Sequence, residues 1–342
     1  MTSAMTARPV LLDAHSDALC DVLYRRRQGE TRVLERRFLP PWRAGNLRAI
    51  ILAVYLENFF VPHMALEIAL EMIDGLRREM EESPGLFALC RTATELDEAL
   101  AKGRIALLLS LEGAEPVGTN LSLLRTLHQL GVRLMGLTWS RRNAAADGAA
   151  TRAGAPRSPA GLTPFGRDLV TEAARLGMAL DLSHLNDAGA ADVMAMGAPG
   201  VFASHSSART LLDTERNISD ELIRALAARR GVIGCNAINM LIAADDADAT
   251  VGRVADHIEH IAAVAGRRHV GLGLDICANL PEFGPQKPAQ PGKQALRDIL
   301  GDHSGVTVLW DTLWQRGWPP EDIEALASGN FLTFLRWALP KN

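Results

Sequence analysis

The stretch Met178–Asn217, MALDLSHLNDAGAADVMAMGAPGVFASHSSARTLLDTERN, decides the fold. Two short apolar runs, Met178–Leu182 and Val201–Ala203, are each followed by Ser-His, and a segment of helical length lies between them. This pattern predicts a β-α-β unit in which His184 and His205 stand where parallel strands end. Such ends meet on one face, which carries the chemistry of a closed barrel. One histidine there is weak evidence, but two neighbouring imidazoles make half of a metal site.

Apolar runs of strand length recur along the chain and mostly alternate with segments of helical periodicity. The predicted strands are Pro9–Asp13, Leu47–Val54, Ile105–Leu111, Val132–Thr138, Met178–Leu182, Gly200–Ser204, Gly231–Asn236 and Val270–Leu274. Helices are expected at Ala65–Glu82, Ser219–Arg229 and Thr250–Gly266. Eight strands that alternate with helices predict an α/β fold, a (β/α)8 TIM barrel, and we expect residues 1–342 to form one catalytic barrel domain.

Two segments interrupt this rhythm. Residues 141–166 are rich in Ala, Gly, Pro and Arg, and residues 278–305 are rich in Pro and Gly. Each follows a strand end on the expected active face, which favours long loops that cover a pocket. A plain disordered insertion would have the same composition and is the alternative.

Composition excludes some partners and compartments. Lys and Arg number 36 against 40 Asp and Glu, so no basic face is implied and nucleic acid is not an expected partner. There is no apolar stretch near eighteen residues, no secretory signal and no lipid-anchor pattern, so we expect a cytoplasmic protein without a membrane partner. Four cysteines without a C-x-x-C pair predict free, packed thiols, among which Cys277 follows a strand end on the active face.

Charged residues follow the first and third predicted strands. The first ends in LLDAHSDAL, and in an extended segment His15 and Asp17 point to the same side and can reach one ion. The third ends in LLLSLEGAE, which places Glu112 after a run of buried residues. An unpartnered carboxylate there would be costly, and a cation would remove that cost. A salt bridge to a neighbouring arginine is the alternative.

The same rim includes Asp275, at the end of HVGLGLD. Nitrogen and oxygen ligands without cysteine suit one or two first-row divalent ions, with zinc first among them. The ligands exceed the number that one catalytic zinc uses, so Glu112 is expected to bridge two ions. Two ions would activate a shared water and polarise an amide or ester carbonyl, and Asp275 could pass the proton to the leaving amine. The pattern therefore predicts metal-assisted hydrolysis.

The ordered motifs resemble one family along nearly the whole chain. They are DAHSDAL, LSLEGAE, GVRLMGLTWSRRNAAADG, GLTPFGRDLV, LGMALDLSHLND, VFASHSSAR, ERNISD, HVGLGLD and SGNFL. Together they resemble the membrane dipeptidase (renal dipeptidase) family, peptidase family M19, of amidohydrolase-like binuclear zinc peptidases, in its bacterial-type form.

The resemblance implies a role for each site residue. One Zn²⁺ would be held by His15 and Asp17 and a second by His184 and His205, with Glu112 as the bridge.

Two further residues gain a role from the same resemblance. Arg216, in the ERN motif, would pair with the free carboxylate of a dipeptide, as a planar guanidinium can. A helix-end salt bridge is the alternative for Arg216. Asp275 matches the acid/base aspartate of the family.

Three departures from the family pattern bear on the activity. Trp139 stands in LTWS where many members of the family that it resembles have histidine in LTHS. The resemblance implies that this position contacts the substrate, so we expect the exchange to alter rate and substrate preference. After Asp275 the chain reads Ile-Cys-Ala rather than the x-D-G of the common D-x-D-G motif. The sequence shows no signal, anchor or paired cysteines like those of the animal members, so we expect a bacterial-type form without them.

We therefore expect a dipeptidase that cleaves L-L and L-D dipeptides, and the resemblance suggests a homodimer. The alternatives are a related metal-dependent amidohydrolase or lactonase with another substrate, and a non-catalytic metal-retaining binding protein. The remaining histidines are expected to be solvated or packed, although the spacing of His257 and His260 on one helix could also bind an ion.

Overall fold

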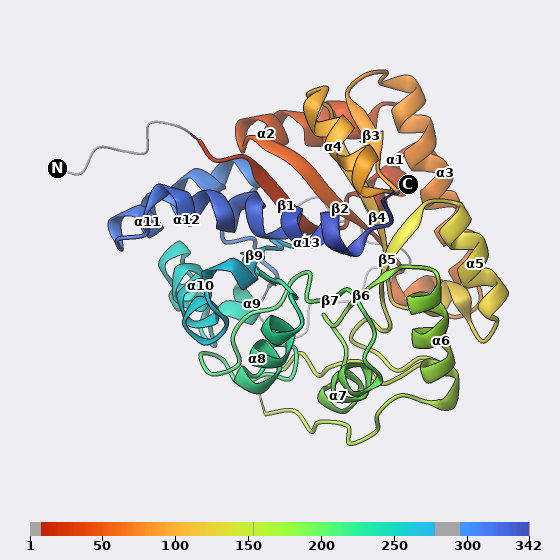
Figure 1. Ribbon diagram of the computed structural model, residues 1–342. Helices are drawn as coiled ribbons and strands as arrows, with labels where there is room; N and C mark the ends of the chain where they lie inside the picture. The colour runs from red at the N-terminus through yellow and green to blue at the C-terminus, as the bar shows by residue number, and fades with distance from the viewer. Residues whose placement is uncertain (1–7, 153, 278–294, 342) are drawn as a thin grey trace.

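The structure, a computed structural model, describes residues 8–152, 154–277 and 295–341. Its strands are β1 Leu11–Ser16, β2 Leu47–Tyr55, β3 Phe87–Leu89, β4 Ile105–Glu112, β5 Val132–Gly136, β6 Ala179–Asp181, β7 Val201–Phe202, β8 Ile233–Cys235 and β9 Val270–Leu272. Every strand pair is parallel, in the order β1-β2-β4-β5-β6-β7, with β8-β9 as a separate pair. Figure 1 shows these strands surrounded by the helices.

The two sheets are joined into a barrel at both seams. A parallel bridge between Ala203 and Ile233 connects β7 to β8. At the other seam, the amide of Leu274 donates to the Asp13 carboxylate of β1 over 2.8 Å. All eight predicted strands are present, so the predicted (β/α)8 barrel is confirmed.

One strand was not predicted. β3 pairs only with the first residues of β4, Ile105–Leu107, and has three residues. Its sequence, Phe-Ala-Leu, is too short to show a period, and two of its residues are only half-buried.

Helices cover the barrel from outside (Figure 1). They are α1 Ala18–Arg27, α2 Leu39–Ala44, α3 Ala65–Glu82, α4 Ala93–Ala101, α5 Leu121–Gln129, α6 Pro164–Arg175, α7 Asp187–Met196, α8 Asp220–Ala228, α9 Asn239–Ile242, α10 Val251–Ala265, α11 Val306–Gln315, α12 Pro320–Glu324 and α13 Asn330–Ala338. The three predicted helices are α3, α8 and α10. Ser219 and Thr250 cap α8 and α10 by accepting from the amides of Leu222 and Arg253.

The order of residues along the strands explains why apolar side chains fill the interior of the barrel and polar side chains stand at the carboxyl ends of its strands. β4 is buried throughout, as parallel strands covered on both faces are. Its residues Leu108 and Glu112 share a face, and Leu108 belongs to a core cluster that also contains Phe331 and Phe334 of α13. Helix α13 therefore packs against the apolar interior, while Glu112 stands at the carboxyl end of the strands.

The segment between β5 and α6 is tied to neighbouring loops by backbone hydrogen bonds. The amide of Ala149 donates to the carbonyl of His184 over 2.7 Å, and the amide of Arg216 donates to the carbonyl of Ala150 over 3.1 Å. Its predicted role as a pocket cover stays a prediction, as does the single-domain assignment. Most of the second predicted loop, residues 278–294, lies outside the described residues. Within the described ranges, no helix has both the length and the apolar character that crossing a membrane requires.

Candidate active site

Six polar residues predicted from the sequence meet at the carboxyl ends of the barrel strands. His15 lies in β1 and Asp17 just after it, Glu112 ends β4, and the other three, His184, His205 and Asp275, follow β6, β7 and β9. The histidines, Asp17 and Glu112 are buried, and the Asp275 side chain is 15% exposed. The convergence follows from the barrel, because parallel strands present their carboxyl ends on one face.

Glu112 lies at the centre of this cluster. Its Oε1 is 3.0 Å from Nε2 of His184 and 3.7 Å from Nε2 of His205. Its Oε2 lies 3.6 Å from Nε2 of His15. The two oxygens of one carboxylate thus face different imidazoles, although the rings of His15 and His205 are themselves stacked with centroids 3.6 Å apart.

A second set of close contacts surrounds His15. Its Nε2 is 3.6 Å from Oδ1 of Asp17 and 3.7 Å from Oδ1 of Asp275. Ligand atoms of His15, Asp17 and Asp275 all lie within 4.8 Å of one another, as do those of His15, Glu112 and His205. The structure therefore contains two overlapping sets of atoms, each compact enough to surround one cation.

The donor atoms fit a metal better than they fit one another. His15 Nε2, Asp17 Oδ1 and Glu112 Oε2 are buried and have no hydrogen-bond partner in the described chain. Their separations of 3.6 Å exceed hydrogen-bond length but suit atoms that share a cation. Unpaired polar atoms in such a place are costly, and a cation would satisfy them all at once. The set of imidazole nitrogens and carboxylate oxygens suits zinc or a similar divalent ion.

The pKa shifts of the clustered side chains are consistent with a metal site. Burial lowers the pKa of His184 and His205 well below the usual range, and the positive charges of Arg216 and His15 lower it further. Both imidazoles are therefore neutral, the form that binds metals. Burial raises the pKa of Glu112 well above its usual range, and the negative charge of Asp17 adds to the effect.

His15 behaves in the opposite way. Burial lowers its pKa, but the negative charge of Glu112 and the interactions with Asp17 and Asp275 outweigh burial and raise the pKa to about 10. In the metal-free protein, a proton on His15 thus compensates part of the negative charge that a cation would compensate.

Arg216 is buried beside the histidines. One guanidinium nitrogen donates to Oγ of Ser206 over 3.1 Å, and another donates to the carbonyl of His205 over 2.8 Å. Its Nε is buried without a partner in the described chain. The helix-end salt bridge considered from the sequence is not what these contacts show, since both partners are neutral.

Asp275 has two unusual properties. It adopts a left-handed backbone conformation with φ of 58°, and its Oδ2 accepts a hydrogen bond from Asn236 over 3.0 Å. Burial raises its pKa to about 6, with a contribution from the nearby charge of Asp17. Such a carboxyl can exchange a proton near neutral pH, as a general acid or base must.

Trp139 borders the cluster. Its ring stacks on His184 with centroids 5.6 Å apart and planes 29° apart. Tyr55 contacts the same ring at 5.5 Å, and the Arg141 guanidinium lies 5.2 Å from its centroid. Trp139 thus presents an aromatic surface next to a histidine, at the position predicted for substrate binding.

Sequence reasoning missed the side chains that hold the histidines. Ser140 Oγ lies 2.8 Å from Nδ1 of His184, and Ser204 Oγ lies 2.6 Å from Nδ1 of His205. Ser204 also donates to the carboxylate of Asp181. The serine directly before His205 was a signal that could have been used, because metal-binding imidazoles generally have a partner on the other ring nitrogen.

Other histidines lie outside this site. His257 binds the amide of Ala208 and the carbonyl of Ile242 with its two ring nitrogens, and His260 Nε2 lies 2.8 Å from Asp220. These contacts do not favour an ion between His257 and His260. His303, expected to be packed or solvated, is buried and binds Asp13 over 2.8 Å.

The cysteines are free, and Cys277 is only half-buried. Its Sγ donates to the carbonyl of Asp275 over 3.1 Å. Burial and the charge of Asp275 raise the pKa of the Cys277 thiol well above its usual range. The thiol is therefore protonated in the metal-free protein.

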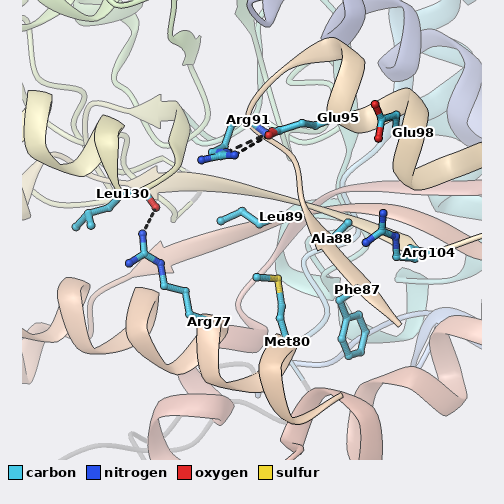
Figure 2. A pocket seen from close by; sticks show the side chains of 10 residues that line it. All are labelled: Arg77, Met80, Phe87, Ala88, Leu89, Arg91, Glu95, Glu98, Arg104 and Leu130. Atoms are coloured by element: carbon cyan, nitrogen blue, oxygen red, sulfur yellow. Dashed lines mark hydrogen bonds and ion pairs between the residues drawn. The ribbon is translucent and has the colours of Figure 1, made fainter. Parts of the chain in front are cut away.

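A cavity of about 440 Å³ lies away from this site, beside β3 and α3. Figure 2 shows Arg91 paired with Glu95 and Arg77 bonded to the carbonyl of Leu130. None of the residues that line it belongs to the histidine cluster. This cavity therefore lies apart from the residues that the sequence predicts for the chemistry.

A parallel barrel with buried imidazoles and carboxylates gathered at its mouth defines a class, the metal-dependent amidohydrolase-like barrels. Within that class, a family model described as membrane dipeptidase (peptidase family M19) matches residues 1–338. The chain belongs to this family of metallo-dipeptidases.

Individual relatives agree with the family assignment. Dipeptidase tcpJ of Claviceps purpurea (strain 20.1) is 31% identical over 300 residues, covering 85% of this chain and 67% of the relative. Dipeptidase 3 of Rattus norvegicus is 31% identical over 297 residues, covering 86% of this chain, which spans only 57% of that relative's length.

A solved structure is also similar. It is a metallo peptidase from Rhodobacter sphaeroides, liganded with a phosphinate mimic of the dipeptide L-Ala-D-Ala. It has a TM-score of 0.83 and 25% identity, and the match covers 96% of this chain and 99% of that one.

Proposed function

We propose that this chain is a binuclear zinc dipeptidase that hydrolyses L-L and L-D dipeptides. The observation that carries the proposal is the position of Glu112, whose two oxygens face His184 and His205 on one side and His15 on the other. In this proposal Asp17 and His15 would hold one ion, His184 and His205 would hold the other, and Glu112 would serve both. When bound, two such ions supply a nucleophilic water at neutral pH and polarise the scissile carbonyl.

The side chains around the ions bind and orient the substrate. Arg216 is buried with its Nε unpaired, and its positive charge suits the free carboxylate of a dipeptide. Because Arg216 also donates to the carbonyl of His205, its distance from the metal-binding side chains is fixed by a direct contact. We propose that the space between Arg216 and the metal-binding side chains accommodates a single residue after the scissile bond. A longer peptide would not fit there, so dipeptides are selected.

Asp275 moves the proton in this proposal. Its Oδ1 faces His15 at 3.7 Å, while Asn236 holds its Oδ2. The raised pKa of about 6 allows the carboxylate to accept a proton at neutral pH and to give it to the leaving amine. The inclusion of L-D dipeptides among the substrates rests on the similar Rhodobacter sphaeroides enzyme, whose bound ligand mimics L-Ala-D-Ala.

The second candidate is a related metal-dependent amidohydrolase or lactonase with another substrate. Trp139 favours it, because the stacked indole beside His184 fills space with an apolar surface at a position where the family resemblance leads us to expect histidine. A non-catalytic metal-retaining protein has no specific observation in its favour. A homodimer, a cytoplasmic location and one barrel domain over residues 1–342 remain proposals.

One experiment tests these candidates together. Metal content is measured by elemental analysis, and hydrolysis of matched L-L and L-D dipeptides is followed by ninhydrin. About two zinc ions per chain with turnover supports the dipeptidase. Two metals without cleavage of any dipeptide favours the second candidate, and a metal-free chain that zinc neither binds nor activates contradicts the binuclear site.

A further inference from the structure

We propose that Asp181 and Ser204 are positioning residues that fix the tautomer of His205. In this arrangement the hydrogen of the neutral imidazole sits on Nδ1, and the lone pair of Nε2 faces the Glu112 cluster. The inference rests on the proposed function for the ion that His205 holds. The arrangement of hydrogen bonds in the protein itself does not depend on that ion and can be measured without it.

The chain of contacts is short and fully enclosed. Ser204 Oγ lies 2.6 Å from Nδ1 of His205 and donates to Oδ2 of Asp181. The other carboxylate oxygen, Oδ1, accepts from the amides of Ser183 and Ser204 over 2.9 and 2.8 Å. Asp181 is 6% exposed, Ser204 1% and His205 0%, so water does not compete for these bonds.

The carboxylate of Asp181 ends this series of hydrogen bonds and determines which group donates in each of them. An ionised carboxylate has no hydrogen to donate, so the hydroxyl of Ser204 must donate to Asp181. The serine has a single hydrogen, which the shorter contact with the carboxylate takes in preference to Ser183 Oγ at 3.3 Å, so its oxygen can only accept from His205. Nδ1 of His205 must then carry the hydrogen, and Nε2 is left as an acceptor or metal ligand.

The opposite side of the ring agrees with this direction. Nε2 of His205 lies 3.7 Å from Oε1 of Glu112 and 2.9 Å from Nε2 of His184. A lone pair at this point is directed at the atoms that form the proposed metal site. The buried negative charge of Asp181, transmitted through one hydroxyl, also makes the imidazole a stronger ligand.

His184 is held differently, which makes the assignment specific. Its Nδ1 lies 2.8 Å from Ser140 Oγ. In the described chain Ser140 donates to no carboxylate, so its hydroxyl can either donate or accept. Although both histidines follow a serine in the sequence, Ser183 binds the amide of His205 instead of the ring of His184. Of these two histidines, only His205 has a tautomer fixed by a carboxylate through its serine partner in the described residues.

The substitution Asp181→Asn separates positioning from packing. The amide has the same shape, but its oxygen is required by the two backbone amides, so its NH₂ group faces Ser204. Ser204 would then accept from Asn and donate to Nδ1 of His205, which moves the imidazole hydrogen to Nε2. That hydrogen would block the metal-facing nitrogen. Ser204→Ala, in contrast, only releases Nδ1 and leaves both tautomers available.

The experiment measures zinc affinity and the tautomer separately. Zinc affinity of the full chain is determined by competition with a chromophoric chelator, for wild type, Asp181→Asn, Ser204→Ala and Ser140→Ala. The tautomer of the metal-free proteins is read from imidazole ¹⁵N chemical shifts. Ser207→Ala is the matched control, because Ser207 is also a buried serine but lies outside the chain of contacts.

We expect Asp181→Asn to weaken zinc binding about 10–100-fold and to move the His205 hydrogen to Nε2. Ser204→Ala should weaken binding less, Ser140→Ala less again, and Ser207→Ala should match wild type. Wild-type zinc affinity in Asp181→Asn, or an Nε2 hydrogen on His205 in the wild type, would overturn the inference. If the wild type binds no divalent ion, the proposed function fails, while the ¹⁵N shifts still decide whether Asp181 and Ser204 fix the tautomer.

Discussion

The substitution Arg216→Met tests how the proposed site recognises a dipeptide. A guanidinium has five N–H groups, and Arg216 uses one for Ser206 and one for the carbonyl of His205. Three remain, including the buried Nε–H, which has no partner in the described chain. A substrate carboxylate can therefore accept two hydrogen bonds from Arg216 without disturbing the contacts that position it.

The expected magnitude follows from those two bonds. A hydrogen bond to a charged group contributes about 1.5–3 kcal/mol, so a pair contributes about 3–6 kcal/mol. Since each 1.4 kcal/mol is about a factor of ten, loss of the pair should lower kcat/KM roughly 10²–10⁴-fold. Arg216→Lys should recover part of this, because lysine keeps the charge but not the planar pair of donors.

The assay compares a dipeptide with its C-terminal amide. The wild type should prefer the free acid by about the factor given above, whereas Arg216→Met should hydrolyse both at similar low rates. The ratio does not depend on the fraction of active protein, so partial unfolding caused by the lost contacts to Ser206 and His205 does not affect it. A ratio in Arg216→Met equal to that of the wild type would show that the carboxylate binds elsewhere.

Three other predictions concern single residues. Asp275→Asn should lower kcat about 10²–10⁴-fold while zinc content stays unchanged, because only proton transfer is removed; loss of zinc would instead make Asp275 a ligand. Trp139→His should change the ranking of a dipeptide panel and leave the metal content intact; an unchanged ranking would argue against substrate contact. Burial lowers the pKa of His257 to about 4, below its usual 6.5. The unfolded chain therefore binds more protons between these values, and stability should fall as pH falls from about 6.5 to 4. His257→Gln should flatten that part of a plot of Tm against pH.

The sequence predicted the barrel and the residues at its mouth for one physical reason. Parallel strands buried on both faces appear as continuous apolar runs, and their ends are marked by the first polar residues, such as Glu112 after β4. Once eight such runs are counted, the barrel rule brings their ends together without further information. β3 escaped this reasoning because three residues, two of them only half-buried, do not form a recognisable run.

Contacts between distant segments could not be predicted in this way. Asp13 lies in the first strand, yet it accepts from the amide of Leu274 and binds His303, 290 residues away in the sequence. The sequence shows only an isolated aspartate and a histidine in a loop. Which side chains meet across a seam depends on strand register and loop path, which apolar periodicity does not specify.

Two residues of the candidate site have a backbone conformation that is unfavourable for residues other than glycine. His184 and Asp275 adopt left-handed conformations with φ of 67° and 58°. A conformation of this kind costs a residue other than glycine about 1 kcal/mol or more, and it persists where the surrounding structure imposes it. The carbonyl of His184 accepts from Ala149 and Thr138, which imposes it at that position. Glycine would relieve the strain at either position but would remove an imidazole or a carboxylate from the cluster. The strain is therefore best explained as the cost of directing these two side chains toward Glu112 and His15, where the proposed ions bind.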